Sequence, residues 1–255
     1  MVDWQASHFI FFPGRVKKSA LHNFQLFFHD SVIEQANSAK YLGLWIDKDL
    51  NFETHISHVT RKVLPMIYAI KRVREKVSQQ ILNQLYFSHV YSHLIFMNPV
   101  WSAATNETKN KLFVLQKKVL RFIQFKDRLS PSRDLFSQKF LPLPVISEFY
   151  LLLLAFKVKN NMIKNNVVLQ YVENIHRYGT RQSHSFYVFM HETRFGIADF
   201  YKRGLIKFNE LTHDLRSIQS LGNFKNKLRE HLFGEFMGVS GVWAYSVYSH
   251  LFIFA

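Results

Sequence analysis

The hydrophobic period of the chain changes near residue 54, and this change constrains the fold more than any other feature of the sequence. Before it, apolar and aromatic runs at 9–12, 24–28, 32–33 and 40–46 are separated by turn-forming residues, which predicts strands. After it, apolar residues recur every three or four positions, which predicts amphipathic helices. We therefore expect an α+β fold, predominantly α, in which a small N-terminal antiparallel sheet precedes a helical bundle and a further helical region.

Three amphipathic helices are predicted between residues 54 and 126. The first carries an apolar stripe over 56–77, and Pro65 within it should kink the helix or split it into two. Ser78 is a suitable N-cap for the second helix, because its hydroxyl can accept a bond from a free backbone N–H. The third helix should begin near Thr105. Three helices at this spacing predict a compact bundle.

The pattern is less regular beyond residue 126. The stretch 127–143 resembles a linker, and Pro144 suits the first turn of a helix that runs to about residue 165. A last helix is predicted at 221–233. We accordingly divide the chain into strands at 1–53, a basic helical bundle at 54–126, a C-terminal helical region at 127–235 and an unassigned aromatic tail at 236–255.

The net charge of +15 is distributed unevenly. Residues 54–126 hold 12 Lys and Arg against two Asp and Glu, a net charge of +10, whereas residues 1–53 have a net charge of −1. Positive charge at this density attracts polyanions, either nucleic acid or an acidic membrane surface. A solvated helical face is the alternative interpretation. The cations expected to bind nucleic acid are Arg61, Lys62, Lys71, Arg72, Arg74, Lys76, Lys117, Lys118 and Arg121.

No complete catalytic constellation can be assembled from the sequence. The chain has no cysteine, which excludes disulfides, thiolate zinc sites and a cysteine nucleophile. It also lacks a P-loop, a Gly-x-Ser-x-Gly elbow and a Gly-x-Gly-x-x-Gly loop. No two aspartates are adjacent, and a two-metal polymerase needs carboxylates that hold both ions. We predict that this chain is inactive by itself.

Two weaker patterns could hold a metal ion. Asp47 and Asp49 follow a predicted strand, and Glu53 is the carboxylate nearest to them in sequence. Two histidine pairs also lie one helical turn apart, His55 with His58 and His89 with His93. We favour an acidic turn and ordinary packing or surface histidines, and we expect no bound metal. A metal-dependent hydrolase built on these residues is the minor alternative.

Several segments carry a resemblance to one family. The run 40–47, followed by 50–52 and 55–56, resembles the end of the palm and the start of the thumb in reverse transcriptases of non-LTR (LINE-type, jockey-like) retrotransposons. Trp101 precedes Ser102, where the family pattern has Gly. Further similar segments follow in the family's order: Leu85–Ser88, Pro99–Trp101, Leu115–Arg121, Gly179–Arg181, Phe208–Leu211 and Asn223–Leu228.

The resemblance implies a template–primer-handling region of an RNA-directed DNA polymerase. Tyr41, Leu42 and Gly43 would occupy the primer-grip position, and the helices from residue 54 would form the thumb. The partners would be RNA or an RNA–DNA primer-template and an upstream polymerase portion, because the family's fingers and palm aspartates would precede Met1. We therefore expect a fragment of a mobile-element enzyme. The full-length enzyme would use Mg²⁺, whereas no cofactor is expected in this chain.

One alternative function and the cellular location follow from the same features. The apolar stripes could instead make the chain a helical protein-interaction module without nucleic-acid function, with the charge serving solubility. The first ten residues lack a secretory signal, so we expect an intracellular protein, cytoplasmic or nuclear. The segment 238–255 is too short and too often interrupted by polar residues for a bilayer span, so no stable membrane association is expected.

Overall fold

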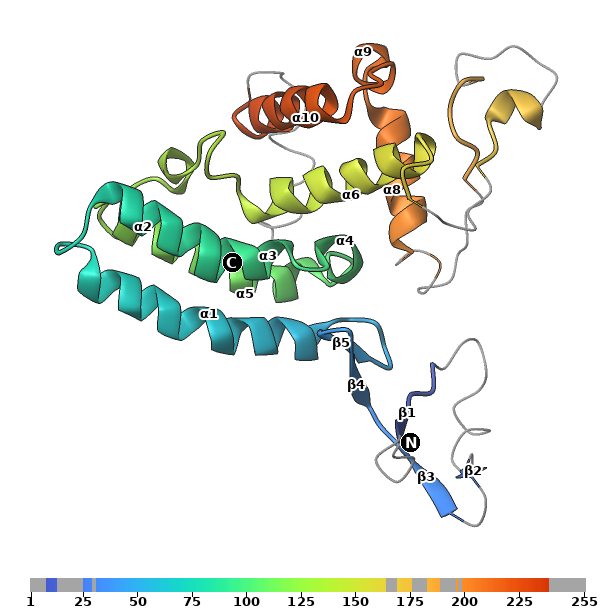
Figure 1. The fold of residues 1–255 in the computed structure, drawn as a ribbon, viewed down its shortest axis with the longest axis horizontal. Helices are drawn as coiled ribbons and strands as arrows, with labels where there is room; N and C mark the ends of the chain where they lie inside the picture. The colour runs from blue at the N-terminus through green and yellow to red at the C-terminus, as the bar shows by residue number, and fades with distance from the viewer. Residues whose placement is uncertain are drawn as a thin grey trace.

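The computed structural model describes residues 8–12, 25–28, 31–163, 169–175, 183–188, 196 and 199–238 (Figure 1). Strands occupy the N-terminal part and helices the rest, which confirms the α+β, predominantly α fold class. The family-like segment Gly179–Arg181 and the tail from residue 239 lie outside the described residues. Among the described helices, none combines the length and the apolar character that a bilayer span requires.

The N-terminal strands form a small mixed sheet and a separate hairpin. Strand β3 (Ser31–Gln35) lies between β1 (His8–Phe9) and β2 (Leu26–Phe28). Strand β1 runs parallel to β3 and β2 runs antiparallel to it, so this sheet is mixed and not purely antiparallel. Strands β4 (Ser38–Tyr41) and β5 (Leu44–Asp47) form the hairpin. Figure 1 shows the hairpin between the mixed sheet and the helical part of the molecule.

The predicted strand at 40–46 is wrong, because the chain reverses in its middle. Leu42 and Gly43 have φ angles of +46° and +87°, and Tyr41 pairs with Leu44 across the turn. Two successive residues with positive φ form the tight turn that matches the right-handed twist of paired strands. Glycine accepts this conformation without strain, whereas Leu42 adopts it at a cost.

The helical bundle follows the predicted periodicity closely. Its elements are α1 (Glu53–Val73), α2 (Gln79–Tyr86), the π-turn η3 (Phe87–Tyr91), α3 (Ser92–Ile95), α4 (Asn98–Trp101) and α5 (Asn106–Ile123). The predicted N-cap is confirmed, since the Ser78 hydroxyl accepts from the backbone N–H of Ile81. The third helix begins where it was expected, and there the Thr105 hydroxyl accepts from the backbone N–H of Thr108. Pro65 lies on the exposed side of α1 and does not split the helix, which is a single element there.

The core of this bundle joins α1 to the helices that follow. The apolar stripe of α1 is buried against α5 and α3, as the sequence predicted. The fully enclosed side chains of this core include Ile56, Val63, Ile67, Leu82, Tyr86, Val90, Leu94, Trp101, Leu112, Val119, Leu120, Ile123 and Leu135. Burial of this much apolar surface is the main stabilising contribution to the bundle.

The C-terminal helices pack around α6 and form a second apolar cluster. They are α6 (Leu143–Lys159), α8 (Phe200–Glu210), α9 (His213–Arg216) and α10 (Leu221–Phe236), together with the short turns η4 (Ser132–Leu135) and η5 (Val172–Asn174). Helix α6 ends at Lys159, earlier than predicted. Helix α8 was not predicted, and its buried Gly204 explains why: a Cβ at this position would lie 3.2 Å from the Leu151 carbonyl oxygen. Glycine weakens a helical pattern in sequence although packing requires it here.

The stretch 127–143 is not a linker. Leu135, Phe136 and Phe140 are buried in the core of the bundle, and Leu141 belongs to the second cluster. The two clusters therefore meet through this segment, and the partly buried Phe236 of α10 packs against both.

Gln116 joins three parts of the molecule through buried hydrogen bonds. Its amide nitrogen donates to the Tyr86 hydroxyl at 3.0 Å and to the Leu141 carbonyl at 2.8 Å. Its amide oxygen accepts from the Leu143 backbone N–H at 2.8 Å. That N–H is one of the helix-start donors of α6 that have no partner within the helix, so a side chain of α5 caps α6. Gln116 itself is fully buried.

We expect Gln116→Leu to lower the free energy of unfolding by roughly 3 kcal/mol or more, because three buried polar groups lose their partner. Urea denaturation followed by circular dichroism measures the change. Gln80→Leu, on the exposed face of α2, is the matched control and should change stability by no more than about 0.5 kcal/mol. Equal stability of the two variants would contradict the role given to Gln116.

Candidate nucleic-acid interface

The turn between β4 and β5 presents apolar side chains at the surface. Tyr41 and Leu42 are 65% and 70% exposed, and Phe96, which follows α3, is 45% exposed. A Cβ at Gly43 would lie 3.1 Å from the Phe96 ring, so the turn and the end of α3 are in close contact. The three residues that sequence resemblance assigned to a primer-grip position therefore sit against the bundle, with two large side chains facing solvent.

Buried polar residues hold the hairpin on the start of α1. The backbone N–H of Trp45 donates to Nδ1 of His55 at 3.5 Å, and the Trp45 ring lies 6.1 Å from that of His58. One carboxylate oxygen of Asp47 accepts from the Asn51 backbone N–H at 2.8 Å. Burial lowers the pKa of His55 to about 4, so this imidazole is neutral at pH 7. These contacts fix the direction in which the turn points.

The same contacts bear on the metal hypothesis. Asp47 stabilises the β5–α1 connection through its bond to Asn51, and burial raises the pKa of its carboxyl. Across the described part of the chain, no three His, Asp or Glu side chains gather in a way that could hold a metal ion. Within these ranges, the pair Asp47 and Asp49 and the two histidine pairs therefore do not combine into a metal site.

Beside the turn, β4, α1, η3 and α3 contribute a group of cationic and titratable side chains that we call the hairpin-side cluster. It consists of Lys40, His58, Arg61, Lys62, His89 and His93. Partial burial, then Lys62, Arg61 and Lys40, and then His93 lower the pKa of His58. Burial followed by Lys62 and His89 lowers the pKa of His93. Mutual repulsion of this kind shows that the cluster is short of negative charge.

No carboxylate balances this cluster within the described ranges. The ion pairs found there join other residues, and none includes a member of the hairpin-side cluster. Lys40 and Lys62 are exposed, so both amino groups can reach a ligand in solvent. An anion placed beside the turn would relieve the repulsion.

A second group lies along the line where α1 packs on α5, and we call it the α1–α5 seam. It consists of Tyr68, Lys71, Arg74, Lys118, Phe122 and Phe125. Lys118 donates to the Tyr68 hydroxyl at 3.1 Å, and Lys71 lies 5.6 Å from the centre of the Phe122 ring. Arg74 lies 5.3 Å from the Phe125 ring, which is 53% exposed. Cations held over aromatic rings at a surface form a platform for phosphates and bases.

The nine predicted cations thus fall into separate groups. Arg61 and Lys62 belong to the hairpin-side cluster, and Lys71, Arg74 and Lys118 to the seam, about 14 Å further along α1. Arg72 and Lys76 are exposed near the C-terminal end of α1.

The two remaining predicted cations have contacts of their own. Lys117 covers the Phe113 ring at 4.6 Å. Arg121 donates to the Ser130 carbonyl at 3.2 Å and to the Ser132 hydroxyl at 3.0 Å, so it holds the loop after α5. A side chain with two such bonds stabilises the fold and is less accessible to a ligand.

The sequence did not predict three members of the hairpin-side cluster. Lys40 lies directly before the turn, and the sequence favoured ordinary surface or packing roles for His58 and His93. Once the run 40–46 is interpreted as a hairpin, Lys40 and Trp45 become cross-strand partners, and Trp45 leads to His58. The signal that could have identified them is the Leu42-Gly43 turn itself.

Comparisons with known proteins give one relationship. No family model matches the chain, and no solved structure matches it. The chain is similar to a probable RNA-directed DNA polymerase from transposon BS of Drosophila melanogaster, with 26% identity over 95 residues, or 36% of this chain. It spans only about 10% of that protein's length. The similarity supports a relationship to a transposon reverse transcriptase, as the sequence motifs predicted.

Proposed function

We propose that this chain is a template–primer-binding part of a mobile-element reverse transcriptase, with the β4–β5 turn as primer grip and α1 as the leading thumb helix. The observation that carries the proposal is the hairpin-side cluster. It combines Lys40, on the hairpin that carries the exposed Tyr41 and Leu42, with the unbalanced cations Arg61 and Lys62 of α1. The similarity to a transposon polymerase supports an origin in a mobile-element polymerase.

Charge along α1 suits a nucleic-acid backbone. The helix has 21 residues and a length of about 32 Å, and both cation groups lie along it. A phosphate strand that follows α1 would meet the hairpin-side cluster first and the α1–α5 seam second. Contacts of this type neutralise phosphates and release counterions, but they do not distinguish sequences. We therefore expect binding with little sequence preference.

We assign nucleic-acid binding to this chain and no catalytic step. The 255 residues contain no adjacent aspartates, and the partly buried Asp47 is engaged by Asn51. Polymerisation requires carboxylates that hold two metal ions around the displaced phosphate. The isolated chain should therefore incorporate no nucleotide on a primed RNA template.

The protein-interaction alternative also has an observation in its favour. Tyr41, Leu42 and Phe96 form an exposed apolar group, and such groups also occur where proteins dock. The two functions differ in their dependence on charge, because an apolar docking surface does not need the cations around it. Replacing Lys71, Arg72, Arg74 and Lys118 by Gln distinguishes the two functions. Affinity for nucleic acid should fall in this variant, whereas binding to a protein partner should survive. Arg121 is kept, because it holds the loop 130–132.

We expect the affinity for a 20-base-pair RNA–DNA hybrid to fall steeply with salt. If about five cations reach phosphates, log K should fall with log salt at a slope of roughly −4. Lys40→Gln with Lys62→Gln should weaken binding and make the slope less negative by about 0.9 for each lost phosphate contact. Fluorescence anisotropy at several salt concentrations measures both quantities.

The matched control neutralises two lysines far from the turn in sequence, Lys225→Gln with Lys227→Gln on the exposed face of α10. This variant has the same net charge as the first and should bind like the unchanged chain. If both double variants lose the same affinity, total charge and not the hairpin-side cluster determines binding, and the proposed surface is wrong.

Binding should also strengthen as the pH falls through about 6.5. The pKa values of His58 and His93 are lowered from the ordinary 6.5 in the free chain, and a phosphate beside them raises these values. The complex therefore takes up protons, and affinity rises by at most about tenfold per pH unit for each proton. His58→Gln with His93→Gln should flatten the pH profile at constant ionic strength. An unchanged profile would show that neither histidine faces the ligand.

A further inference from the structure

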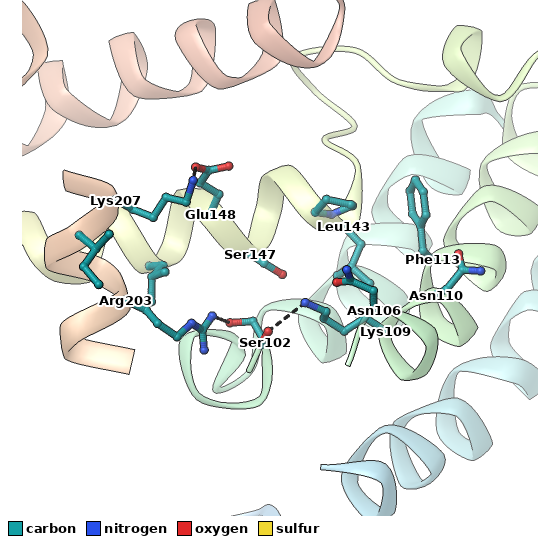
Figure 2. Close-up of a pocket in the computed structure, with 13 residues that line it drawn as sticks. Ser102, Asn106, Lys109, Asn110, Phe113, Leu143, Ser147, Glu148, Arg203 and Lys207 are labelled. Atoms are coloured by element: carbon teal, nitrogen blue, oxygen red, sulfur yellow. Dashed lines mark hydrogen bonds and ion pairs between the residues drawn. The ribbon is translucent and has the colours of Figure 1, made fainter. Parts of the chain in front are cut away.

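A second candidate site lies where the bundle meets the C-terminal helices. A cavity of about 310 Å³ opens between α4, α5, α6 and α8 (Figure 2). Its size lies at the lower end of the range found for small-molecule sites. It is lined by apolar groups, among them Phe113, Leu143 and Ile206, and by charged and polar side chains.

Two cations meet at one residue in the polar part of this cavity. Arg203 donates to the Ser102 hydroxyl at 2.8 Å, and Lys109 donates to the Ser102 carbonyl oxygen at 3.1 Å. Figure 2 shows the two side chains reaching Ser102 from opposite directions. They come from α8 and α5, about a hundred residues apart in sequence, so the fold and not the local sequence creates this pair.

Glu148, the carboxylate among the residues that line the cavity, already forms an ion pair. Glu148 lies 3.4 Å from the Lys207 amino group, which also bonds Glu210 at 2.8 Å. Burial lowers the pKa of Lys207, but the facing Glu148 and Glu210 outweigh burial and the pKa is raised. Asp199, the other acidic group near Arg203, caps the start of α8 by accepting from the Tyr201 N–H.

Two polar atoms of residues that line the cavity are left without partners. The second terminal nitrogen of Arg203 (Nη1) and the Ser147 hydroxyl are buried, and neither has a hydrogen-bond partner among the described residues. Burial and then the charge of Arg203 lower the pKa of Lys109 to about 8. Buried donors without acceptors, next to two cations that repel each other, cost stability. An oxyanion beside Arg203 would offer its guanidinium an acceptor and balance the charge of Lys109.

We propose that this cavity binds a small organic anion. Its phosphate or carboxylate head lies between Arg203 and Lys109 and accepts from the Ser147 hydroxyl, and its apolar body lies against Phe113 and Leu143. A guanidinium matches the geometry of either oxyanion. The site is separate from the nucleic-acid surface proposed above and does not depend on it.

Calorimetric titration with phenyl phosphate tests the site. We expect one phenyl phosphate per chain, bound at least about tenfold more tightly than inorganic phosphate because the ring is buried as well. Benzoate serves as the carboxylate probe, and the tighter of the two aromatic anions identifies the preferred head group. Phenol, which has no charge near pH 7, should not bind measurably. Absence of saturable binding by both aromatic anions overturns the proposal.

Arg203→Gln should weaken phenyl phosphate binding by about tenfold or more, because a charged hydrogen bond to the anion is lost. Lys109→Met is the second variant and keeps the inference testable if Arg203→Gln does not fold. It should lose affinity to a similar degree while raising the melting temperature, since a buried charge is replaced by an apolar chain. Lys111→Met, on the exposed side of α5, is the matched control and should change neither. Unchanged affinity in Lys109→Met overturns the proposal.

The protonation of Lys109 gives an independent measurement. Its pKa of about 8 in the free chain should rise when phenyl phosphate binds, because the anion stabilises the ammonium form. Affinity should therefore decline as the pH rises from 7 to 9, where the probe stays dianionic. The charged groups that share the cavity are Arg203, Lys207 and Glu148, and Lys207 remains protonated through its carboxylate partners. Lysine Cε shifts recorded by NMR with and without the probe measure the change, and an unchanged pKa contradicts the site.

Discussion

The fold depends on one buried amide more than on any other polar group. Gln116 of α5 uses its side-chain nitrogen to bind Tyr86 and the Leu141 carbonyl, and its oxygen to cap the first turn of α6 at Leu143. The first apolar cluster would otherwise meet the second only through apolar contacts, which resist sliding weakly. Hydrogen bonds with fixed geometry in a low dielectric define one arrangement of α2, α5 and α6. The position of the cavity between α5 and α6 follows from that arrangement.

The bundle in turn fixes the surface proposed to bind nucleic acid. Helix α1 packs along α5 through its apolar stripe. Any rotation of α1 that moved its cations out of solvent would also expose this stripe, so the cations stay at the surface. The hairpin is held on α1 through Trp45, His55 and Asp47, and its turn rests on Phe96. A turn that is to hold a nucleic-acid strand needs such support, because binding residues on mobile loops are positioned less precisely. The turn and the helix therefore act as one rigid surface.

Periodicity predicted the elements, but not the contacts that only folding creates. The sequence predicted the stripe of α1, the cap at Ser78 and the start of α5 near Thr105, because each depends on residues close in sequence. Helix α8 was missed because Gly204 weakens its pattern, although close packing on α6 requires a residue without a side chain. The sequence did not predict that Lys109 and Arg203 both donate to Ser102, because no local pattern indicates contacts between residues so far apart in sequence.

Positive charge without partners connects the two sites that the structure offers. Any chain with a net charge of +15 pays for self-repulsion when it folds, and nearby carboxylates normally reduce that cost. At Lys207 they do so, since Glu148 and Glu210 surround it. At the hairpin-side cluster the described residues include no such partner. Beside Arg203 the nearby carboxylate is Asp199, which already caps the start of α8. An anion bound at either place would therefore stabilise the folded state. The ligands that we propose, a polyanion at the open surface and a small anion in the cavity, would recover the stability lost at these two places.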